Sequence, residues 1–472
     1  MNTDTLSTGS LRSQFNELKH AFEDTPYLPI EQRLALLKKL RANIVTLEQD
    51  LIAAVSKDFG YRTAFDTLVG DILPTMQGLA HIIKKLPRWS KPSQRSAGLS
   101  LWPSKVSVTY QPIGVVGVIA PWNYPIQLAL VPVITAIAAG NRVMLKLSEF
   151  TPNTNAVIEK IFADELSQHC TIIQGGSDVA SEFSSLPFAH LLFTGSTAVG
   201  KLVMAAASKN LTPVTLELGG KSPVIVLEKA DVNKAARALL FGKMANAGQI
   251  CVAPDYVFVP KAVEHQFIKA LCTLYKKHFK QGVEGKNLTS IISPAHYQRL
   301  LGYLEQAQEQ GAKITKPLEQ NQQDGEKHRM GLHIVTHVTD EMTLMQEELF
   351  GPILPIMSYD KLEDVLNYIR LRDHPLALYI LGQDKQAQQY LIKQTLSGTV
   401  AVNDTLIQVV ADDVPFGGVG HSGMGHYHGK EGFLTFSHAK NTLVSGSVNP
   451  RIGLLLKQNK LLIKVLKWLY VK

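Results

Sequence analysis

The sequence predicts an α/β fold in which parallel β-sheets are covered by helices. The first indication is the alternation of strand-like and helix-like segments beyond about residue 104. The second is the length of 472 residues, which is too great for one compact core and predicts two or three domains. The third is the composition, because 45% hydrophobic and 19% charged residues are typical of globular proteins and exclude a disordered or fibrous chain.

The individual elements follow from the periodicity of the apolar residues. The first hundred residues have helical patterns, and in residues 31–50 leucines and isoleucines recur at helical spacing among charged residues. Beyond them we predict strands at residues 105–110, 114–120, 143–146, 190–194 and 224–227, and helices at 128–139, from about Lys201 and from about Asp231. Gly140 is expected to close the helix at 128–139.

The cysteines and the N-terminal residues indicate an intracellular protein. The three cysteines, Cys170, Cys251 and Cys272, show no paired spacing, so we expect neither a disulfide framework nor a zinc site. The first ten residues are polar and lack the apolar stretch of a secretion signal. No apolar run is long enough to span a bilayer. We therefore predict a cytoplasmic location.

The net charge of +8 is concentrated at the C-terminal end. Residues 451–472 hold six basic residues and no acidic one, which leaves +2 for the rest of the chain. A basic tail on a nearly neutral body is a local surface feature, so we predict no binding to nucleic acid. Lysines at three- and four-residue spacing alternate with leucines there, which predicts a basic amphipathic helix. Its apolar face either lies peripherally on an anionic membrane or packs against the body or a second subunit.

Cys251 and Glu217 are the candidate catalytic residues. Cys251 stands in Gly-Gln-Ile-Cys-Val, and Glu217 stands in Leu-Glu-Leu-Gly-Gly-Lys. A thiolate can attack a carbonyl carbon, and a carboxylate can activate the water that releases the product. A lone cysteine is more often an inert apolar residue, so this interpretation depends on the other motifs.

Two polar segments follow predicted strands, where ligands of α/β sheets gather. Asn123, in Pro-Trp-Asn-Tyr-Pro, is placed to donate to the oxyanion of a tetrahedral intermediate, or else shapes a turn between two prolines. Lys146 and Glu149 are placed to hold the hydroxyls of an adenosine ribose, or else form an ordinary surface ion pair.

Two further segments have the composition of a nucleotide site. Residues 195–200 place glycines at a strand-to-helix turn whose backbone amides can receive a pyrophosphate, although the spacing differs from Gly-x-Gly-x-x-Gly. Glu348 and Phe350 precede Gly-Pro, where they either contact a second ribose and a ring or mark a helix end. The glycine-rich segment 415–429 holds three histidines, His421, His426 and His428, whose spacing matches no zinc site, so we expect no metal.

Taken together and in this order, the motifs resemble the aldehyde dehydrogenase superfamily. The resemblance extends to about Lys440 and rests on Pro-Trp-Asn, Leu-Glu-Leu-Gly-Gly-Lys, Gly-Gln-x-Cys, Glu-x-Phe-Gly-Pro and Pro-Phe-Gly-Gly. Ser-Gly-Met-Gly-x-Tyr-His-Gly is similar to the class 3 branch, and Asp58-Phe-Gly-Tyr-Arg62 to its coniferyl and fatty aldehyde dehydrogenases. One departure is Leu147, where relatives often have proline.

The resemblance implies a domain plan. It places a Rossmann-like NAD-binding domain at residues 1–103 and 113–218 and an α/β catalytic domain at 219–416. Small bridging β segments for oligomerisation, implying a homodimer, correspond to 104–112 and 417–450, and the amphipathic tail is 451–472.

The resemblance also implies a role for each site residue. Cys251 would be the nucleophile, Asn123 and the Cys251 amide the oxyanion hole, and Glu217 the base. Lys146 and Glu149 would hold the adenosine ribose, and Glu348 the nicotinamide ribose. The other implied cofactor contacts are Trp122, Gly195, Ser196, Thr197, Gly200, Leu218 and Phe350.

The activity implied is oxidation of an aromatic, coniferyl-type aldehyde or of a medium- or long-chain aliphatic aldehyde to the acid. A thiohemiacetal and then a thioester would form on Cys251. NAD is the expected cofactor because Glu149 would repel a 2′-phosphate, although class 3 relatives often accept NADP as well. The alternatives are acyl transfer to coenzyme A, which the presence of Glu217 disfavours, and a non-catalytic protein on the same scaffold.

Overall fold

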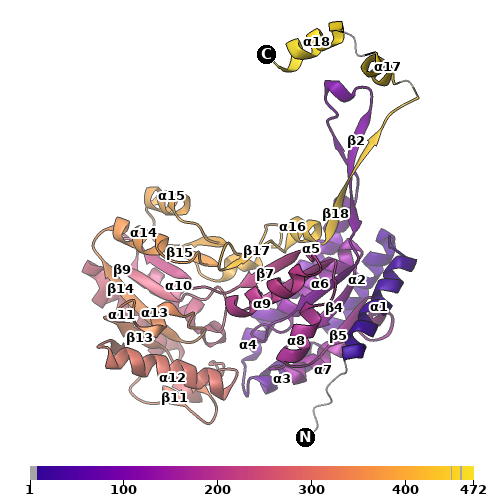
Figure 1. Ribbon diagram of the computed structural model, residues 1–472. Helices are drawn as coiled ribbons and strands as arrows, with labels where there is room; N and C mark the ends of the chain where they lie inside the picture. The colour runs from indigo at the N-terminus through magenta and orange to yellow at the C-terminus, as the bar shows by residue number, and fades with distance from the viewer. Residues whose placement is uncertain (1–7, 448, 458–459, 472) are drawn as a thin grey trace.

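The protein has two α/β lobes and a projecting β arm, as the computed structural model shows (Figure 1). The structure describes residues 8–447, 449–457 and 460–471. Small parts of the predicted segments 1–103, 417–450 and 451–472 therefore lie outside the described residues. The predicted α/β fold with parallel sheets is confirmed.

The first lobe is built on a mostly parallel sheet. Within the described residues its six strands are, in spatial order, β17 (Gly423–Met424), β7 (Val214–Leu218), β6 (His190–Gly195), β3 (Val115–Ile119), β4 (Arg142–Lys146) and β5 (Cys170–Ile173). β17 pairs antiparallel with β7, and the other neighbours are parallel. The ends of β3, β4, β6 and β7 therefore meet at one edge, which places the segments after them side by side.

Helices cover both faces of the first sheet. One face packs against α1 (Thr8–Asp24), α8 (Ser177–Ser184) and α9 (Thr197–Ser208). The other packs against α6 (Gln127–Ala139), which is buried on all sides because α2 (Ile30–Thr46), α5 (Leu73–Trp89) and α16 (Gly429–Thr435) lie over it. The remaining helices of this lobe are α3 (Glu48–Asp58), α4 (Ala64–Thr67) and α7 (Pro152–Ile161).

The second lobe has a larger sheet of the same kind. In the part of the chain that the structure describes, its seven strands are β10 (Lys313–Thr315), β13 (His333–Thr336), β14 (Ile353–Tyr359), β9 (Tyr256–Pro260), β8 (Pro223–Val226), β15 (Ala377–Leu381) and β16 (Thr399–Val402). Only β10 is antiparallel to its neighbour. A short hairpin pairs β11 (Gln323–Asp324) with β12 (Arg329–Met330).

The helices of the second lobe also divide between the faces of its sheet. The core of one face includes α10 (Val232–Met244) and α11 (Glu264–His278). The core of the other includes α12 (Pro294–Glu309), α13 (Thr343–Gln346), α14 (Leu362–Arg370) and α15 (Lys385–Gln394).

The arm is a three-stranded antiparallel sheet that stands away from both lobes (Figure 1). It holds β1 (Ser93–Arg95), β2 (Lys105–Pro112) and β18 (Ser437–Val444), with β2 in the middle. The two long strands belong to the predicted bridging segments. Part of the predicted segment 417–450 joins the first lobe instead, because β17 pairs with β7 and α16 packs on α6.

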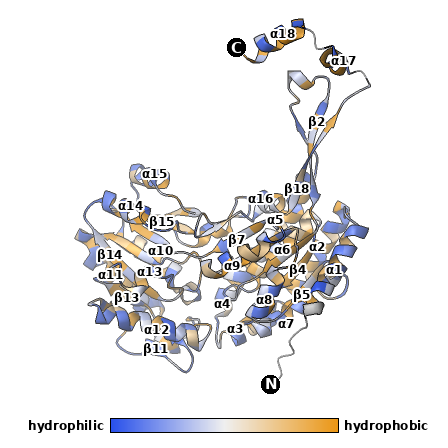
Figure 2. Ribbon diagram, in the orientation of Figure 1, coloured by the Kyte–Doolittle hydropathy of each residue, from blue (hydrophilic) through white to orange (hydrophobic). Residues whose placement is uncertain are grey.

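The C-terminal tail forms two helices beyond the tip of the arm, α17 (Pro450–Leu456) and α18 (Lys460–Tyr470) (Figure 1). Exposed apolar side chains of the tail include Leu456 and Trp468, at 77% and 65%. Figure 2 shows hydrophobic and hydrophilic residues mixed along both helices, which lie apart from the two lobes. Among the described residues, no helix is long and apolar enough to cross a membrane.

Several predicted boundaries were wrong by a few residues. The helical pattern of residues 31–50 is interrupted at Leu47, between α2 and α3. α9 begins at Thr197 instead of about Lys201, because the Ser196 hydroxyl accepts the Val199 N–H at 3.4 Å and caps the helix earlier. The helix predicted at 128–139 is α6, and Gly140 closes it in the left-handed conformation with φ 97°.

Candidate active site

The backbone before Cys251 is tightly wound. Asn246, Ala247 and Gly248 have φ values of 47°, 53° and 75°, three consecutive left-handed residues at the end of α10. Only glycine fits at position 248, since a Cβ there would lie 2.6 Å from the Gly351 carbonyl oxygen. Such strain persists only where surrounding contacts determine the conformation.

Gln249 supplies many of those contacts. Its side-chain amide donates to the Asn246 and Ser290 carbonyls, at 3.0 Å each, and its Oε1 accepts the Ile292 N–H at 3.0 Å. Its own carbonyl accepts a hydrogen bond from Asn123 Nδ2 at 3.2 Å. The residue before Ile250-Cys251 is thus tied to both lobes, and Asn123 lies beside the Cys251 loop.

Glu217 is a buried carboxyl group with unused hydrogen-bonding capacity. It lies near the end of β7, is 3% exposed, and neither carboxyl oxygen has a hydrogen-bond partner in the described residues. Burial raises the pKa of Glu217 well above its ordinary value. A buried carboxyl group that no protein group satisfies is typical of a site that acts on a ligand or a water.

The thiol of Cys251 is close enough to both glutamates to sense their charge. Burial raises the pKa of Cys251 to about 12, and the charges of Glu348 and Glu217 raise it further. The backbone N–H groups of Cys251 and Val252 act in the opposite direction. The thiol is therefore protonated at neutral pH and needs activation before it can act as a nucleophile.

Lys146 and Glu149 lie at the carboxyl end of β4. Lys146 Nζ is 3.0 Å from Glu149 Oε2; the lysine is buried, whereas the Glu149 side chain is 44% exposed. They line one cleft together with Trp122, Gly195 and Ser196, which come from two other segments. The structure thus assembles five predicted cofactor contacts in one place.

Gly200, Leu218 and Thr197 do not line this cleft. Gly200 packs on Leu218, since an added Cβ would lie 2.6 Å from the leucine Cδ2. The Thr197 hydroxyl donates to the His421 carbonyl at 3.0 Å and ties α9 to the glycine-rich segment. These three residues support the turn between β6 and α9 and do not face the cleft.

Glu348 lies against the Gly219–Gly220 turn. A Cβ at Gly219 would lie 1.9 Å from the Glu348 carboxylate, so only glycine permits this approach. Burial raises the pKa of Glu348 to about 8, helped by the charge of Asp255. The Phe350 ring lies 5.4 Å from the ring of Trp122, which borders the cleft.

This arrangement fits a dinucleotide. The 12-residue helix α9 begins beside Gly195 and Ser196, so its N-terminus presents backbone N–H groups suited to a pyrophosphate. The Glu149 carboxylate is exposed enough to accept ribose hydroxyls. Glu348 offers a second carboxylate, which lies close enough to Cys251 for its charge to raise the pKa of the thiol.

Comparisons with known proteins agree with this geometry. The model of the "Aldehyde dehydrogenase family" matches residues 9–442. A "Probable coniferyl aldehyde dehydrogenase" of Pseudomonas aeruginosa is 46% identical and covers 91% of this chain and 90% of its own. The chain belongs to the aldehyde dehydrogenase family. It is an oxidoreductase that converts aldehydes to carboxylic acids with NAD or NADP as hydride acceptor.

Two further relatives come from Staphylococcus aureus. A "4,4'-diaponeurosporen-aldehyde dehydrogenase" is 38% identical over 91% of this chain and 93% of its own. The solved "Substrate bound state of Staphylococcus Aureus AldH" has a TM-score of 0.89 at 38% identity and covers 93% of this chain and 95% of that one. The alternative of a non-catalytic scaffold finds no support among these dehydrogenases.

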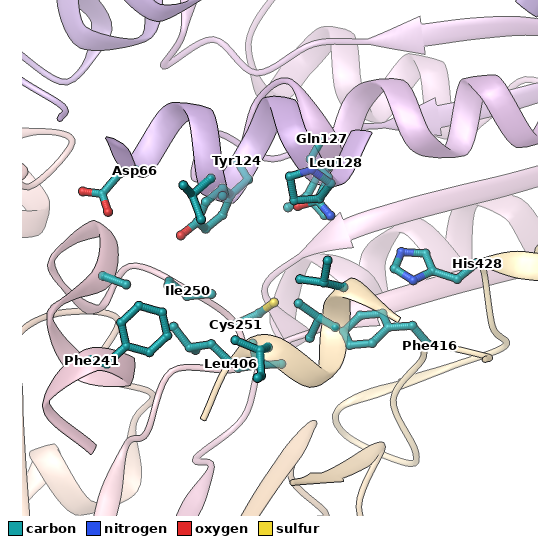
Figure 3. A pocket seen from close by; sticks show the side chains of 18 of the residues that line it. Asp66, Tyr124, Gln127, Leu128, Phe241, Ile250, Cys251, Leu406, Phe416 and His428 are labelled. Carbon is teal, nitrogen blue, oxygen red and sulfur yellow. The ribbon is translucent and has the colours of Figure 1, made fainter. Parts of the chain in front are cut away.

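In this aldehyde dehydrogenase, Cys251 opens into an apolar pocket that the sequence did not predict (Figure 3). Figure 3 shows Asp66 and Phe241 toward one end of the pocket and Phe416 and His428 toward the other. Aromatic and aliphatic side chains dominate the lining, which includes Phe65, Tyr124, Leu128, Phe241, Ile250, Leu406, Val409, Phe416 and Tyr427. The pocket is suited to a hydrophobic aldehyde.

The sequence also did not identify the support of Asn123. Arg62 donates to the Asn123 carbonyl at 2.7 Å and lies 3.4 Å from Asp71, with both charged side chains fully buried. Asp71 Oδ1 accepts the Ile126 and Gln127 N–H groups at the start of α6. Arg62 belongs to a segment quoted for its resemblance, but nothing in the sequence pairs it with Asp71.

Proposed function

We propose that Cys251, Asn123 and Glu217 carry out the oxidation of a hydrophobic aldehyde in two covalent stages. The observation that carries the proposal is that the Cys251 pocket is apolar, while the buried Glu217 carboxyl group finds no hydrogen-bond partner in the described residues and lies close enough for its charge to raise the pKa of the thiol. An aromatic, coniferyl-type aldehyde and a medium- or long-chain aliphatic aldehyde both suit this lining. The names of the Pseudomonas and Staphylococcus relatives support an extended, apolar substrate.

In the first stage the Cys251 sulfur adds to the aldehyde carbon. The Asn123 amide and the Cys251 backbone N–H hold the resulting oxyanion, and a preorganised donor of this kind contributes roughly a hundred- to thousandfold in rate. An oxidised nicotinamide, whose ribose Glu348 would hold, would supply the hydride acceptor and a positive charge when bound. The sulfur then carries the acyl group as a thioester.

In the second stage Glu217 takes a proton from a water that attacks the thioester carbon. Cys251 leaves as the thiol or thiolate, and the carboxylic acid is released. The reaction balances as aldehyde, water and oxidised cofactor giving acid, reduced cofactor and a proton. Glu217 favours hydrolysis over transfer to coenzyme A, because transfer to a thiol needs no activated water.

The proposed cofactor contacts are Lys146 and Glu149 at the adenosine ribose, the start of α9 at the pyrophosphate, and Glu348 at the nicotinamide ribose. We expect a preference for NAD, since the Glu149 carboxylate would repel a 2′-phosphate.

The test is reduced-cofactor formation, followed by absorbance, on cinnamyl-type, long-chain and short aldehydes with NAD and with NADP. We expect turnover of the first two classes with NAD, and loss of turnover in Cys251→Ala. Cys272→Ala is the matched control, since that thiol lies on α11 and outside the pocket. Hydride transfer that persisted in Cys251→Ala would overturn the assignment.

We propose in addition that the protein is a homodimer joined through the arm. β18 is an edge strand, and within the described residues only β2 pairs with it, over Ser437–Val444. An open edge of this length is a template for a strand from a second chain.

The tail supports a third proposal, that the protein contacts membranes peripherally from the cytoplasm. Lys460, Lys464 and Lys467 of α18 recur at helical spacing beside exposed apolar residues. Ile463, Leu466 and Trp468 of this helix are exposed, so they are available to the acyl boundary of an anionic bilayer.

A further inference from the structure

His428 lies within the apolar pocket of Cys251 and contributes a polar group to it (Figure 3). The residue precedes α16 and is 8% exposed. Its Nδ1 atom is buried without a hydrogen-bond partner, and in the described part of the chain the other ring nitrogen makes no hydrogen bond either. A neutral imidazole offers one donor and one acceptor, so His428 has hydrogen-bonding capacity that the protein does not use.

Aromatic rings fix the orientation of this imidazole. It stacks on Phe416 at 5.4 Å between centroids and 27° between planes, and it meets the ring of Tyr427 edge-on at 4.5 Å. The backbone of His428 has φ 95°, which non-glycine residues rarely adopt. Burial lowers the pKa of His428 to about 4, so the ring is uncharged at neutral pH.

A ligand that hydrogen-bonds to the His428 imidazole would remove the free-energy cost of its unpaired ring nitrogens. A buried polar group without a partner costs free energy that a matching donor or acceptor recovers. The surrounding rings favour a flat apolar ligand, and the imidazole adds one polar contact at the Phe416 end of the pocket. A neutral hydroxyl suits it better than a charged group, because the pocket wall is apolar.

We propose that His428 hydrogen-bonds a hydroxyl on the ring of an aromatic aldehyde and thereby selects hydroxylated aryl aldehydes over unsubstituted ones. The inference rests on the proposed oxidation at Cys251, whose substrate class it narrows. A site built to hydrogen-bond a hydroxyl discriminates against the analogue that lacks it, since the site's own polar group then remains unpaired.

The test compares 4-hydroxycinnamaldehyde with cinnamaldehyde, which differ by one hydroxyl group. The measurement is the ratio of their kcat/KM values in the wild type, His428→Phe and His428→Asn. Phenylalanine keeps the ring packing and removes both nitrogens, whereas asparagine keeps a polar group and tolerates positive φ. His426→Phe is the matched control, as this exposed histidine of the same segment does not line the pocket.

We expect the wild type and His426→Phe to prefer the hydroxylated aldehyde by about tenfold, the usual cost of one unpaired neutral group. His428→Phe should abolish the preference, and His428→Asn should restore part of it. An equal preference in wild type and His428→Phe, or none in the wild type, would overturn the proposal.

Binding of the product acids separates this claim from the proposed reaction. Calorimetric titration with 4-hydroxycinnamic acid and cinnamic acid needs no turnover. If the wild type oxidised neither aldehyde, the proposed substrate class would fail. A hydroxyl-dependent affinity that disappears in His428→Phe would still support the role of His428, and its absence would refute it.

Discussion

At the scale of single residues, burial disfavours the charged forms that the chemistry needs. It raises the pKa values of both Cys251 and Glu217, so the surroundings favour the uncharged thiol and the uncharged carboxyl group. Each ionised group would repel the other, and neither has a cationic side chain among the causes of its shift. The positive charge of an oxidised nicotinamide would lower the pKa of the Cys251 thiol, so cofactor binding would favour the thiolate.

Glu217→Gln should separate the two stages of the reaction. The amide retains the shape of the side chain but takes no proton from water, so hydrolysis should slow by about a hundredfold or more. Rapid-mixing absorbance should show one equivalent of reduced cofactor formed quickly, followed by a slow steady rate.

The pH dependence of hydrolysis should also distinguish Glu217→Gln from the wild type. Because the folded-state pKa of Glu217 is raised, its basic form appears only as the pH rises through that raised value. Wild-type hydrolysis should therefore accelerate with pH, and Glu217→Gln should lose this limb of the profile. A steady rate without a burst in Glu217→Gln, or a pH profile equal to that of the wild type, would contradict the assignment of Glu217 as base.

At the scale of elements, the strand ends were predictable and the contacts between distant segments were not. Apolar runs bounded by glycine and proline indicated β3, β4 and β6, and parallel pairing then brings the residues after them to one edge. The break at Leu47 leaves the helical periodicity intact, so no sequence signal marked it. Arg62 and His428 acquire their roles only through tertiary contacts with Asn123 and with the pocket.

Arg62→Met tests whether the start of α6 and the Asn123 loop depend on the buried ion pair. Without its donor, the Asn123 carbonyl loses a 2.7 Å hydrogen bond, and we expect the displaced amide to lower kcat about tenfold. Arg41→Met, an exposed substitution on α2, is the control and should leave kcat unchanged.

The stability of the Arg62 variant should depend on pH. Burial raises the pKa of Asp71 to about 6, and Arg62 opposes that rise. A carboxyl group whose pKa is raised in the folded state stabilises the protein at pH values below its unfolded-state pKa. That stability is lost as the pH rises through the folded-state pKa. The melting temperature of Arg62→Met should therefore fall more steeply than that of the wild type between about pH 4 and pH 8. Parallel profiles would refute this coupling.

At the scale of the whole molecule, the arm and the tail expose apolar side chains to solvent. Leu443 and Val444, at the end of β18, are 46% and 57% exposed. If the edge of β18 joins a second chain, lysines at these two positions should prevent pairing, because charge on an edge strand blocks strand addition. Sedimentation velocity should give a dimer for the wild type and for the control variant Lys440→Gln. It should give a monomer for the double variant that carries Leu443→Lys and Val444→Lys. A monomeric wild type would contradict the proposal.

The tail should make membrane binding depend on lipid charge. Each lysine near an anionic surface contributes about 1 kcal/mol, and exposed apolar residues of α18 add their burial in the interface. Sedimentation with liposomes should recover the full chain in the pellet with phosphatidylserine and much less with phosphatidylcholine alone. Removal of residues 451–472 should leave the protein in the supernatant with both lipids, while turnover of a cinnamyl-type aldehyde shows that the body remains folded. Equal recovery of both chains in the supernatant would remove the membrane role and leave the apolar face of the tail to a second protein surface.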